Sequence, residues 1–256
     1  MFKIATWNVN SIRVRLDQVL QWLEKEQPDV LALQETKLPD ENFPVAGFEA
    51  AGYRVCSNGQ KTYNGVAILS RRPLKVIATE FPGYNDPQRR VLCAVHEDIA
   101  VLNLYVPNGS EVGSEKYAYK LDWLAQLQTY TSALLQEYPR CVMLGDFNIA
   151  PEDEDVHDPE VWRGKVLFSE PERATLQKLM EQGFADCFRL FPRDEPQFSW
   201  WDYRAAAFRR NRGLRIDHIL ASQALKDHCS ACDIDIEPRR LERPSDHAPV
   251  VATFDL

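Results

Sequence analysis

Six short polar clusters stand beside apolar runs in this sequence, and together they contain carboxylates, amides and imidazoles. They are Trp7-Asn8, Gln34-Glu35, Pro107-Asn108, Gly145-Asp146-Phe147-Asn148, Ile216-Asp217-His218 and Ser245-Asp246-His247. Hydrolysis of a phosphodiester needs a metal ion that neutralises the phosphate, a water activated for in-line attack, and help for the departing oxygen. The clusters contain residue types that can meet all three needs, so they predict a metal-dependent phosphodiesterase.

Hard oxygen donors suited to Mg²⁺, for which Mn²⁺ can substitute, stand in three of these clusters. Glu35 and Asp246 offer carboxylates and Asn8 offers an amide oxygen. A small set of protein ligands is typical, because Mg²⁺ keeps several of its waters. Whether one or two ions serve the reaction stays open.

The remaining candidates could handle protons and phosphate oxygens. Asp146 could hold the attacking water as a general base or share the metal, and Asn148, two residues on, would point to the same side. Asp217 beside His247 forms a possible carboxylate–imidazole pair, and Tyr105 could donate a hydrogen bond to a phosphate oxygen. Either Asp146 or His247 could be the final general base.

Each of these residues also has an ordinary structural explanation. Glu35 could be a solvated loop residue, and Asp146 and Asn148 could cap a turn or a helix. Tyr105 could belong to the core. Only their joint occurrence at the ends of predicted strands favours one shared cleft, because strand ends can aim side chains at a common point.

Short apolar runs with polar flanks predict buried strands. These runs are Ile4–Trp7, Val30–Leu33, Val66–Leu69, Val101–Val106, Val142–Leu144, Ile216–Leu220 and Val250–Phe254. Helical spacing recurs over residues 16–23, 121–134 and 171–182, with Gly183 as the stop of the last helix. No low-complexity linker divides residues 1–256. We therefore expect a single α/β domain, a four-layer sandwich of two packed mixed sheets flanked by helices.

The charge distribution limits the possible partners. The chain has 30 basic and 38 acidic residues and a net charge of −8, so any contact with DNA must use a local basic face. Residues 152–160 carry six acids, whereas residues 200–215 carry five arginines and one aspartate. The second stretch is a candidate DNA-facing surface, although its arginines could also be a plain solvated face.

Cysteine use and hydropathy favour a cytoplasmic monomer that has no membrane partner. The six cysteines are scattered, and several lie inside apolar runs, which is typical of reduced thiols. No run approaches the length of a membrane span, and the first residues lack the apolar core of a signal peptide. The pair Cys229 and Cys232 lacks a second pair at zinc spacing, which argues against a zinc site.

Seven segments strongly resemble the exonuclease III family, the bacterial apurinic/apyrimidinic endonucleases of the endonuclease/exonuclease/phosphatase superfamily. They occur in the family's order and cover essentially the whole chain. The segments are Trp7–Arg13, Leu33–Lys37, Gly59–Lys61 with Gly65–Ala67, Tyr105–Gly109, Gly145–Pro151, Gly213–His218 and Ser245–Pro249.

The resemblance implies roles for individual residues. It implies metal ligands at Asn8, Glu35, Asp146, Asn148 and Asp246, and catalytic roles for Tyr105, Asp146, Asn148, Asp217 and His247. It implies substrate contacts at Asn10, Lys61, Tyr63, Asn64, Asn108, Lys116, Trp200, Arg204 and Leu214. Among these, Trp200 and Leu214 would form the wall of a pocket for a baseless sugar, with residues 162–167 as a further rim. Asn10 stands where some relatives place a second acid.

The implied activity is base-excision repair of double-stranded DNA. It comprises incision 5′ to abasic sites that leaves a 3′ hydroxyl, together with 3′-phosphatase, 3′-phosphodiesterase and 3′→5′ exonuclease activity. An alternative is an enzyme restricted to blocked 3′ ends, with little abasic endonuclease activity. A phosphoinositide or sphingomyelin phosphoesterase and a non-catalytic DNA-binding module are further rivals. The aromatic and arginine residues of 200–215 argue against the lipid enzymes, and the complete catalytic set argues against the inactive module.

Overall fold

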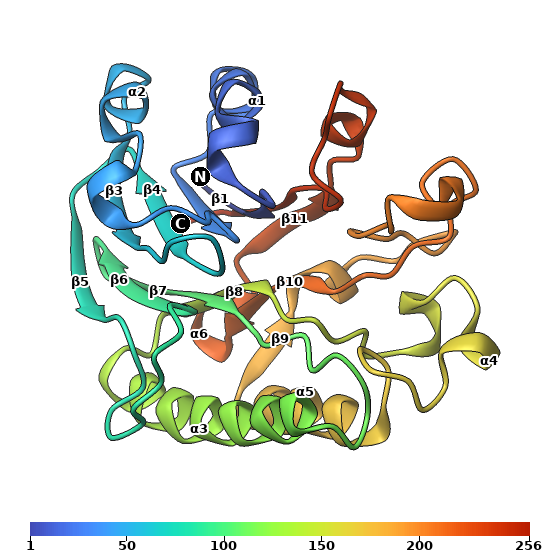
Figure 1. Cartoon of the computed structure of the whole chain (residues 1–256). Helices are drawn as coiled ribbons and strands as arrows, with labels where there is room; N and C mark the ends of the chain where they lie inside the picture. Colours follow the sequence, from blue (N-terminus) through green and yellow to red (C-terminus); the bar gives the residue numbers. More distant parts are fainter.

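The computed structural model describes all 256 residues and contains two six-stranded sheets that lie face to face (Figure 1). The first sheet has the order β11-β12-β1-β2-β4-β3. Its strands are β1 (Phe2–Asn8), β2 (Val30–Gln34), β3 (Arg54–Asn58), β4 (Val66–Ser70), β11 (Cys229–Ile234) and β12 (Val250–Phe254). Only the pair β1 and β2 is parallel, and the other neighbours are antiparallel.

The second sheet repeats this plan with the order β5-β6-β7-β8-β10-β9. Its strands are β5 (Leu74–Ala78), β6 (Val91–His96), β7 (Ile99–Tyr105), β8 (Cys141–Asp146), β9 (Phe184–Asp186) and β10 (Asp217–Ser222). Here the only parallel pair is β7 and β8. Both sheets are therefore mixed, as the sequence predicted.

Helices cover the two outer faces of the sandwich (Figure 1). Helices α1 (Ile12–Glu26) and α2 (Val45–Ala50) pack on the first sheet, and α3 (Glu115–Glu137) and α5 (Glu170–Glu181) pack on the second. Two short helices, α4 (Pro159–Trp162) and α6 (Gln223–Lys226), lie in connections. Short 3₁₀ segments are formed by Asp40–Asn42, Asp153–Asp155, Cys187–Leu190, Arg204–Ala206 and Glu237–Arg240. The four-layer α/β sandwich expected from the sequence is confirmed.

Alternate side chains of the central strands point into two different cores, which explains why these strands are continuous apolar runs in the sequence. In β1, Ile4 belongs to the core between the sheets, whereas Ala5 and Trp7 belong to the core under α1 and α2. In β8, Leu144 faces the other sheet and Met143 faces α3 and α5. Because both faces of each strand are buried, polar residues are displaced to the strand ends.

Strand register brings the polar ends of the second sheet into one row. Tyr105 at the end of β7 pairs with Asp146 at the end of β8, and Asp146 pairs with Asp217 at the start of β10. In the first sheet, Asn8 at the end of β1 pairs with Gln34, the residue before Glu35. The two sheets thus present their polar ends at one edge of the sandwich.

The close approach of the β7 and β8 backbones requires a glycine next to Asp146. Gly145 has φ 143°, and a Cβ atom at this position would lie 1.9 Å from the carbonyl oxygen of Leu104. A residue with a side chain could not keep the two strands at their present spacing. Gly145 therefore fixes the position of Asp146, which follows it directly.

Candidate active site

The centre of the site is a buried triad formed by Asp146, Asp217 and His247. The Nδ1 atom of His247 lies 2.9 Å from Oδ2 of Asp217, and its Nε2 atom lies 3.8 Å from Oδ2 of Asp146. The three residues are between 1% and 5% exposed. This arrangement orients the imidazole between two carboxylates, as the predicted carboxylate–imidazole pair requires.

Burial and charge act in opposite directions on these groups. Burial alone would lower the pKa of His247, but the carboxylates of Asp217 and Asp146 raise it to about 10. Burial raises the pKa of Asp146, although the neighbouring His247 opposes that shift. The imidazole is therefore a cation at neutral pH, and Asp146 binds its proton more tightly than an exposed aspartate does.

Hydroxyl and indole groups of Ser199, Ser245 and Trp7 hold the triad in place. Ser199 donates from Oγ to Oδ2 of Asp217 at 2.6 Å and accepts the Asp217 backbone N–H. Ser245 accepts the backbone N–H of His247, and Trp7 donates to its carbonyl oxygen at 3.2 Å. Ser245 and Trp7 lie inside segments that resemble the family, whereas no spacing pattern in the sequence marks Ser199.

A chain of amide hydrogen bonds extends from Asp146 to the neighbouring loops. Asn8 donates from Nδ2 to Oδ2 of Asp146 at 2.8 Å, and the backbone N–H of Asn148 donates to its Oδ1 at 2.9 Å. The side-chain amide of Asn148 donates to the carbonyl oxygen of Val106 and accepts from Nδ2 of Asn108 at 3.0 Å. Asn8, Asp146, Asn148 and Asn108 thus form one connected network of hydrogen bonds.

The second part of the site surrounds Glu35. The hydroxyl of Tyr105 donates to Oε1 of Glu35, and the ammonium of Lys37 lies 3.0 Å from its Oε2. Burial, together with the Glu35 carboxylate, keeps the pKa of Tyr105 well above its ordinary value, so the phenol stays protonated. Lys37 also donates to Oδ1 of Asn10, whose amide donates to Oδ1 of Asp246 at 2.9 Å.

The donor chemistry beside Glu35 fits a hard divalent cation. Carboxylate oxygens of Glu35 and Asp246, together with the amide oxygens of Asn8 and Asn10, are ligands that such ions prefer. Asp246 has both oxygens engaged by N–H donors, from Asn10 and from Nε1 of Trp200 at 3.0 Å, and each oxygen retains a free lone pair.

The triad is a second candidate for metal binding, because its potential ligand atoms all lie within 4.8 Å of one another. The carboxylates of Asp217 and Asp146 raise the pKa of His247, so a cation at the triad would compete with the proton on the imidazole. The site therefore combines oxygen donors around Glu35 with a buried carboxylate–imidazole cluster around Asp146 and His247.

Several residues with strained backbone lie around the same edge. Positive φ angles occur at Asn10, Ser11, Glu35, Lys37 and Asn148, all of which are residues with side chains. Such conformations cost free energy and persist only where the surrounding structure determines them. They turn the chain sharply at the ends of β1, β2 and β8, so that the polar side chains converge.

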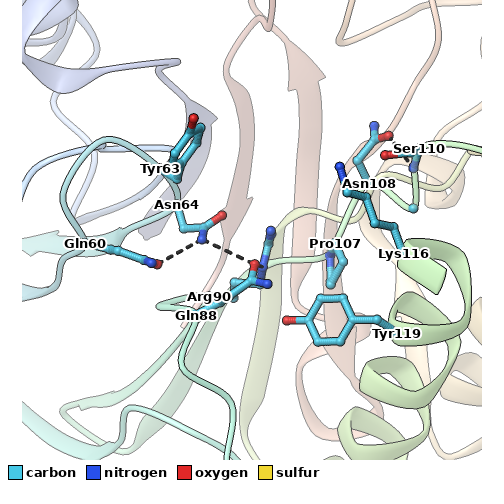
Figure 2. A pocket seen from close by; sticks show the side chains of 11 residues that line it. Gln60, Tyr63, Asn64, Gln88, Arg90, Pro107, Asn108, Ser110, Lys116 and Tyr119 are labelled. Atoms are coloured by element: carbon cyan, nitrogen blue, oxygen red, sulfur yellow. Dashed lines mark hydrogen bonds between the residues drawn. The ribbon is translucent and has the colours of Figure 1, made fainter.

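A polar cavity of about 420 Å³ adjoins this edge (Figure 2). The lining residues come from three loops and from α3, and they are Gln60, Tyr63, Asn64, Gln88, Arg90, Pro107, Asn108, Gly109, Ser110, Lys116 and Tyr119. Arg90 lines the cavity and also contacts Tyr105 of the site. Its guanidinium carbon lies 4.5 Å from the centroid of the Tyr105 ring. Asn64 is held by the side chains of Gln60 and Gln88.

The predicted substrate contacts divide into four groups. Tyr63, Asn64, Asn108 and Lys116 line the cavity of Figure 2, and Asn10 and Trp200 contact Asp246. The side chains of Lys61, on a loop, and Arg204, in a 3₁₀ segment, are exposed. Leu214 is fully buried, and its backbone forms isolated bridges with Trp200 and Val156. Of the proposed pocket wall, only Trp200 is partly exposed.

The expectation that residues 200–215 form a DNA-facing surface is wrong for one of their five arginines, Arg215. Arg215 is 1% exposed and forms ion pairs of 2.7 Å with Asp155 and with Asp186. A guanidinium that neutralises two buried carboxylates is unavailable to a phosphate. Arg204, Arg209, Arg210 and Arg212 are exposed, so the candidate surface is confined to them.

Comparison with known proteins agrees with this geometry. The family model described as "Endonuclease/Exonuclease/phosphatase family" matches residues 5–247. Exodeoxyribonuclease III of Haemophilus influenzae is 41% identical over 98% of this chain and 99% of its own length. The chain is also similar to the solved structure of the 3′ phosphatase NExo from Neisseria bound to a product DNA hairpin, at 44% identity, a TM-score of 0.98 and full coverage of both chains. An AP endonuclease from Archaeoglobus fulgidus gives 41% identity and a TM-score of 0.96, again with full coverage of both chains. The chain therefore belongs to the endonuclease/exonuclease/phosphatase family.

Proposed function

We propose that residues 1–256 act as one catalytic unit, a Mg²⁺-dependent phosphodiesterase of DNA base-excision repair. Its substrates are duplexes with abasic sites, cut on the 5′ side to leave a 3′ hydroxyl, and duplexes with blocked 3′ ends. The observation that carries this proposal is the buried Asp146–His247–Asp217 triad next to the oxygen donors around Glu35. Relatives named as exodeoxyribonuclease III and AP endonuclease support the choice of DNA.

The protonation states suggest how the residues share the work. Asp146 is the better candidate for the general base, because its raised pKa brings it nearer to neutrality while His247 is already protonated. The cationic His247 is suited to a phosphate oxygen, and Tyr105 can donate a hydrogen bond from its protonated phenol. A Mg²⁺ ion held by Glu35, Asp246 and Asn8 would supply charge neutralisation of the phosphate when bound.

A second function, restricted to 3′-end processing, is favoured by the state of the predicted sugar pocket. Leu214 and Leu167 are 0% and 5% exposed and pack into one apolar cluster, so neither offers an open wall to an extrahelical sugar. The similar structure from Neisseria is named as a 3′ phosphatase, and the one from Archaeoglobus as an AP endonuclease. The two relatives thus correspond to the two alternatives.

One comparison of substrates tests both functions. The parent protein with Mg²⁺ is incubated with a duplex that contains one abasic site, with a duplex that ends in a 3′ phosphate, and with a phosphoinositide. Incision of the first duplex supports the abasic endonuclease, and release of phosphate from the second alone supports the restricted enzyme. Turnover of the phosphoinositide alone would reject both.

Substitution of Trp200 tests the pocket within that comparison. Trp200→Ala removes both the aromatic wall and the hydrogen bond to Asp246, whereas Trp200→Phe removes only the hydrogen bond. We expect Trp200→Ala to lose more abasic incision than Trp200→Phe, while the two variants remove 3′ phosphate at similar rates. Equal losses of both activities in the two variants would remove the pocket argument and leave the phosphodiesterase proposal standing.

A further inference from the structure

A fully buried ion pair joins the two helices behind the active site. Lys120 of α3 and Glu172 of α5 are both 0% exposed, and the ammonium contacts Oε1 of the carboxylate. Burial lowers the pKa of Lys120, and the carboxylate of Glu172 opposes that shift. Removing two charges from water is unfavourable, and apolar residues of similar volume often fill such positions equally well or better. Stability alone therefore gives a weak reason for this pair.

The other contacts of Lys120 lead directly to the catalytic loops. Its Nζ atom donates to the backbone carbonyl of Asn148 at 2.6 Å and to that of Asn108 at 3.2 Å. With Glu172, these acceptors use all three protons of the ammonium. Asn148 has φ 49°, a conformation that leaves its carbonyl outside any sheet ladder. Lys120 thus satisfies the backbone of two residues whose side chains bond to each other beside Asp146.

Glu172 likewise satisfies backbone groups of a third loop, the segment before α5. Its carboxylate accepts the backbone N–H of Leu167 at 3.0 Å and that of Ser169 at 3.1 Å, and it completes the capping box of α5. Leu167 has φ 74°, which is unfavourable for a leucine, and its carbonyl accepts the N–H of Ala150. The strained segment before α5 is therefore tied to Glu172 on one side and to the loop of Asn148 on the other.

Gly109 shows how closely the loop around Asn108 fits this pair. It has φ 93°, and a Cβ atom there would lie 3.1 Å from Cδ of Lys120 and 3.2 Å from Val166. A side chain at this position would crowd the aliphatic part of Lys120 and would be strained by the left-handed backbone. Three loops with left-handed residues thus meet at one buried charge pair.

We infer that Lys120 and Glu172 are positioning residues for phosphodiester cleavage, which hold the backbone N–H of Asn148 on the Asp146 carboxylate and keep the side chain of Asn108 on that of Asn148. This inference rests on the function proposed above. Neither side chain contacts the triad directly, so both act through the loops that they hold. Supporting groups of this kind commonly change rates by about 10- to 100-fold when they are removed.

The main test replaces the pair by apolar residues of similar size. Lys120→Met/Glu172→Leu removes both charges together, so that no buried charge is left unpaired. We expect kcat on a DNA duplex to fall about 10- to 100-fold with little change in KM. The free energy of unfolding should fall as well, because the backbone groups that Lys120 and Glu172 satisfy lose their partners. Thr131→Val is the matched control, because it changes another fully buried polar group between α3 and the end of α5, far from the catalytic loops. This control should keep the kcat of the parent.

A double-mutant cycle with Asn148→Ala separates positioning from general damage. If the pair acts through Asn148, the combined variant should be only slightly slower than Asn148→Ala alone. Fully additive losses in kcat, or an unchanged kcat in Lys120→Met/Glu172→Leu, would overturn the inference. Should the double replacement not fold, Glu172→Gln enters the same cycle, because it removes the counter-charge and keeps the length of the side chain.

A spectroscopic measurement tests the positioning role of Lys120 and Glu172 independently of the proposed function. The side-chain amide resonance of Asn148, assigned through its loss in Asn148→Ala, should shift in Lys120→Met/Glu172→Leu and stay in place in Thr131→Val. An inactive parent would reject the proposed function, whereas the amide shift would still test the positioning. An unmoved resonance in the apolar variant would overturn the positioning role.

Discussion

The polar groups of the site are held at a cost to stability. Asp146 and Asp217 are both buried, and one cation, His247, lies between them. Burial disfavours these charges. The two carboxylates more than offset this penalty for His247, whereas the pKa of Asp146 stays raised because burial outweighs the attraction of His247. Groups with perturbed pKa values that converge at the end of a rigid sheet are a frequent sign of catalysis. At the scale of single residues, the site can therefore be tested through protonation and through metal binding.

The raised pKa of His247 predicts a pH dependence of stability. The folded state holds this proton up to a pKa of about 10, whereas an unfolded histidine releases it near about 6.5. Between these values the folded protein binds more protons than the unfolded chain, so stability falls as pH rises. We expect urea unfolding of the metal-free protein to show this decline from about pH 7 to 10, and His247→Asn to show a flatter one. Parallel declines in parent and variant would contradict the assignment.

Loss of the carboxylate of Glu35 should resemble removal of the metal. Chelation should abolish activity, and Mg²⁺ or Mn²⁺ should restore it, because the cation neutralises the phosphate. Glu35→Ala should weaken Mn²⁺ binding in calorimetry and lower turnover at limiting Mg²⁺ by about 100-fold or more. Glu41→Ala, which changes an exposed acid on a nearby 3₁₀ segment, serves as the control. Parent-like Mn²⁺ affinity in Glu35→Ala would show that another group is the main ligand.

At the scale of elements, the sequence predicted best those strands whose two faces are both buried. The predicted run Val142–Leu144 became β8, and Val66–Leu69 became β4, because continuous apolar residues leave few alternatives. The edge strands β3, β5, β9 and β11 were not predicted, and neither was β6, although its residues are mostly buried. The pattern of β5 is mostly exposed or half-buried, and β9 has only three residues, so neither shows a clear period.

The same physical difference separates the predicted from the unpredicted site residues. Residues at strand ends, such as Glu35 and Asp146, were found because their position follows from the strand itself. Ser199 and Lys120 were not found, because their roles depend on contacts with residues that are distant in the sequence. Arg215 was misassigned for the same reason, since its partner Asp155 lies 60 positions away.

Gly145 provides a test at this scale. Gly145→Ala should destabilise the protein by roughly 2 to 4 kcal/mol, because its Cβ would collide with the Leu104 carbonyl and its φ is unfavourable for alanine. Gly183→Ala is the matched control, with φ 112° but nothing within 4 Å of the added atom. Thermal or urea unfolding of both variants separates the collision from the backbone strain. Equal destabilisation in the two variants would show that the contact between β7 and β8 relaxes easily.

At the scale of the whole molecule, the distribution of charge matters more than its sum. The net charge is −8, and the structure contains no helix long and apolar enough to cross a membrane. The exposed arginines Arg204, Arg209, Arg210 and Arg212 form one local basic segment next to Trp200 in the sequence. Each phosphate that such a surface neutralises releases counterions, which makes binding sensitive to salt even for an acidic protein.

This distribution predicts a measurable change in salt dependence. The logarithm of the DNA affinity should fall linearly with the logarithm of the salt concentration, with a slope of about 0.9 for each neutralised phosphate. Arg209→Ala/Arg212→Ala should therefore make the slope shallower by up to about 2 between roughly 50 and 200 mM salt. Arg54→Ala/Arg72→Ala is the control, because it removes the same charge at the opposite ends of the strands. Arg54 pairs with Ser70, at the end of β4 that lies away from the site. This control variant should keep the slope of the parent. If both double variants keep the parent slope, the arginines are a solvated face, and the cavity bounded by Tyr63 and Lys116 becomes the main candidate for the phosphate contacts.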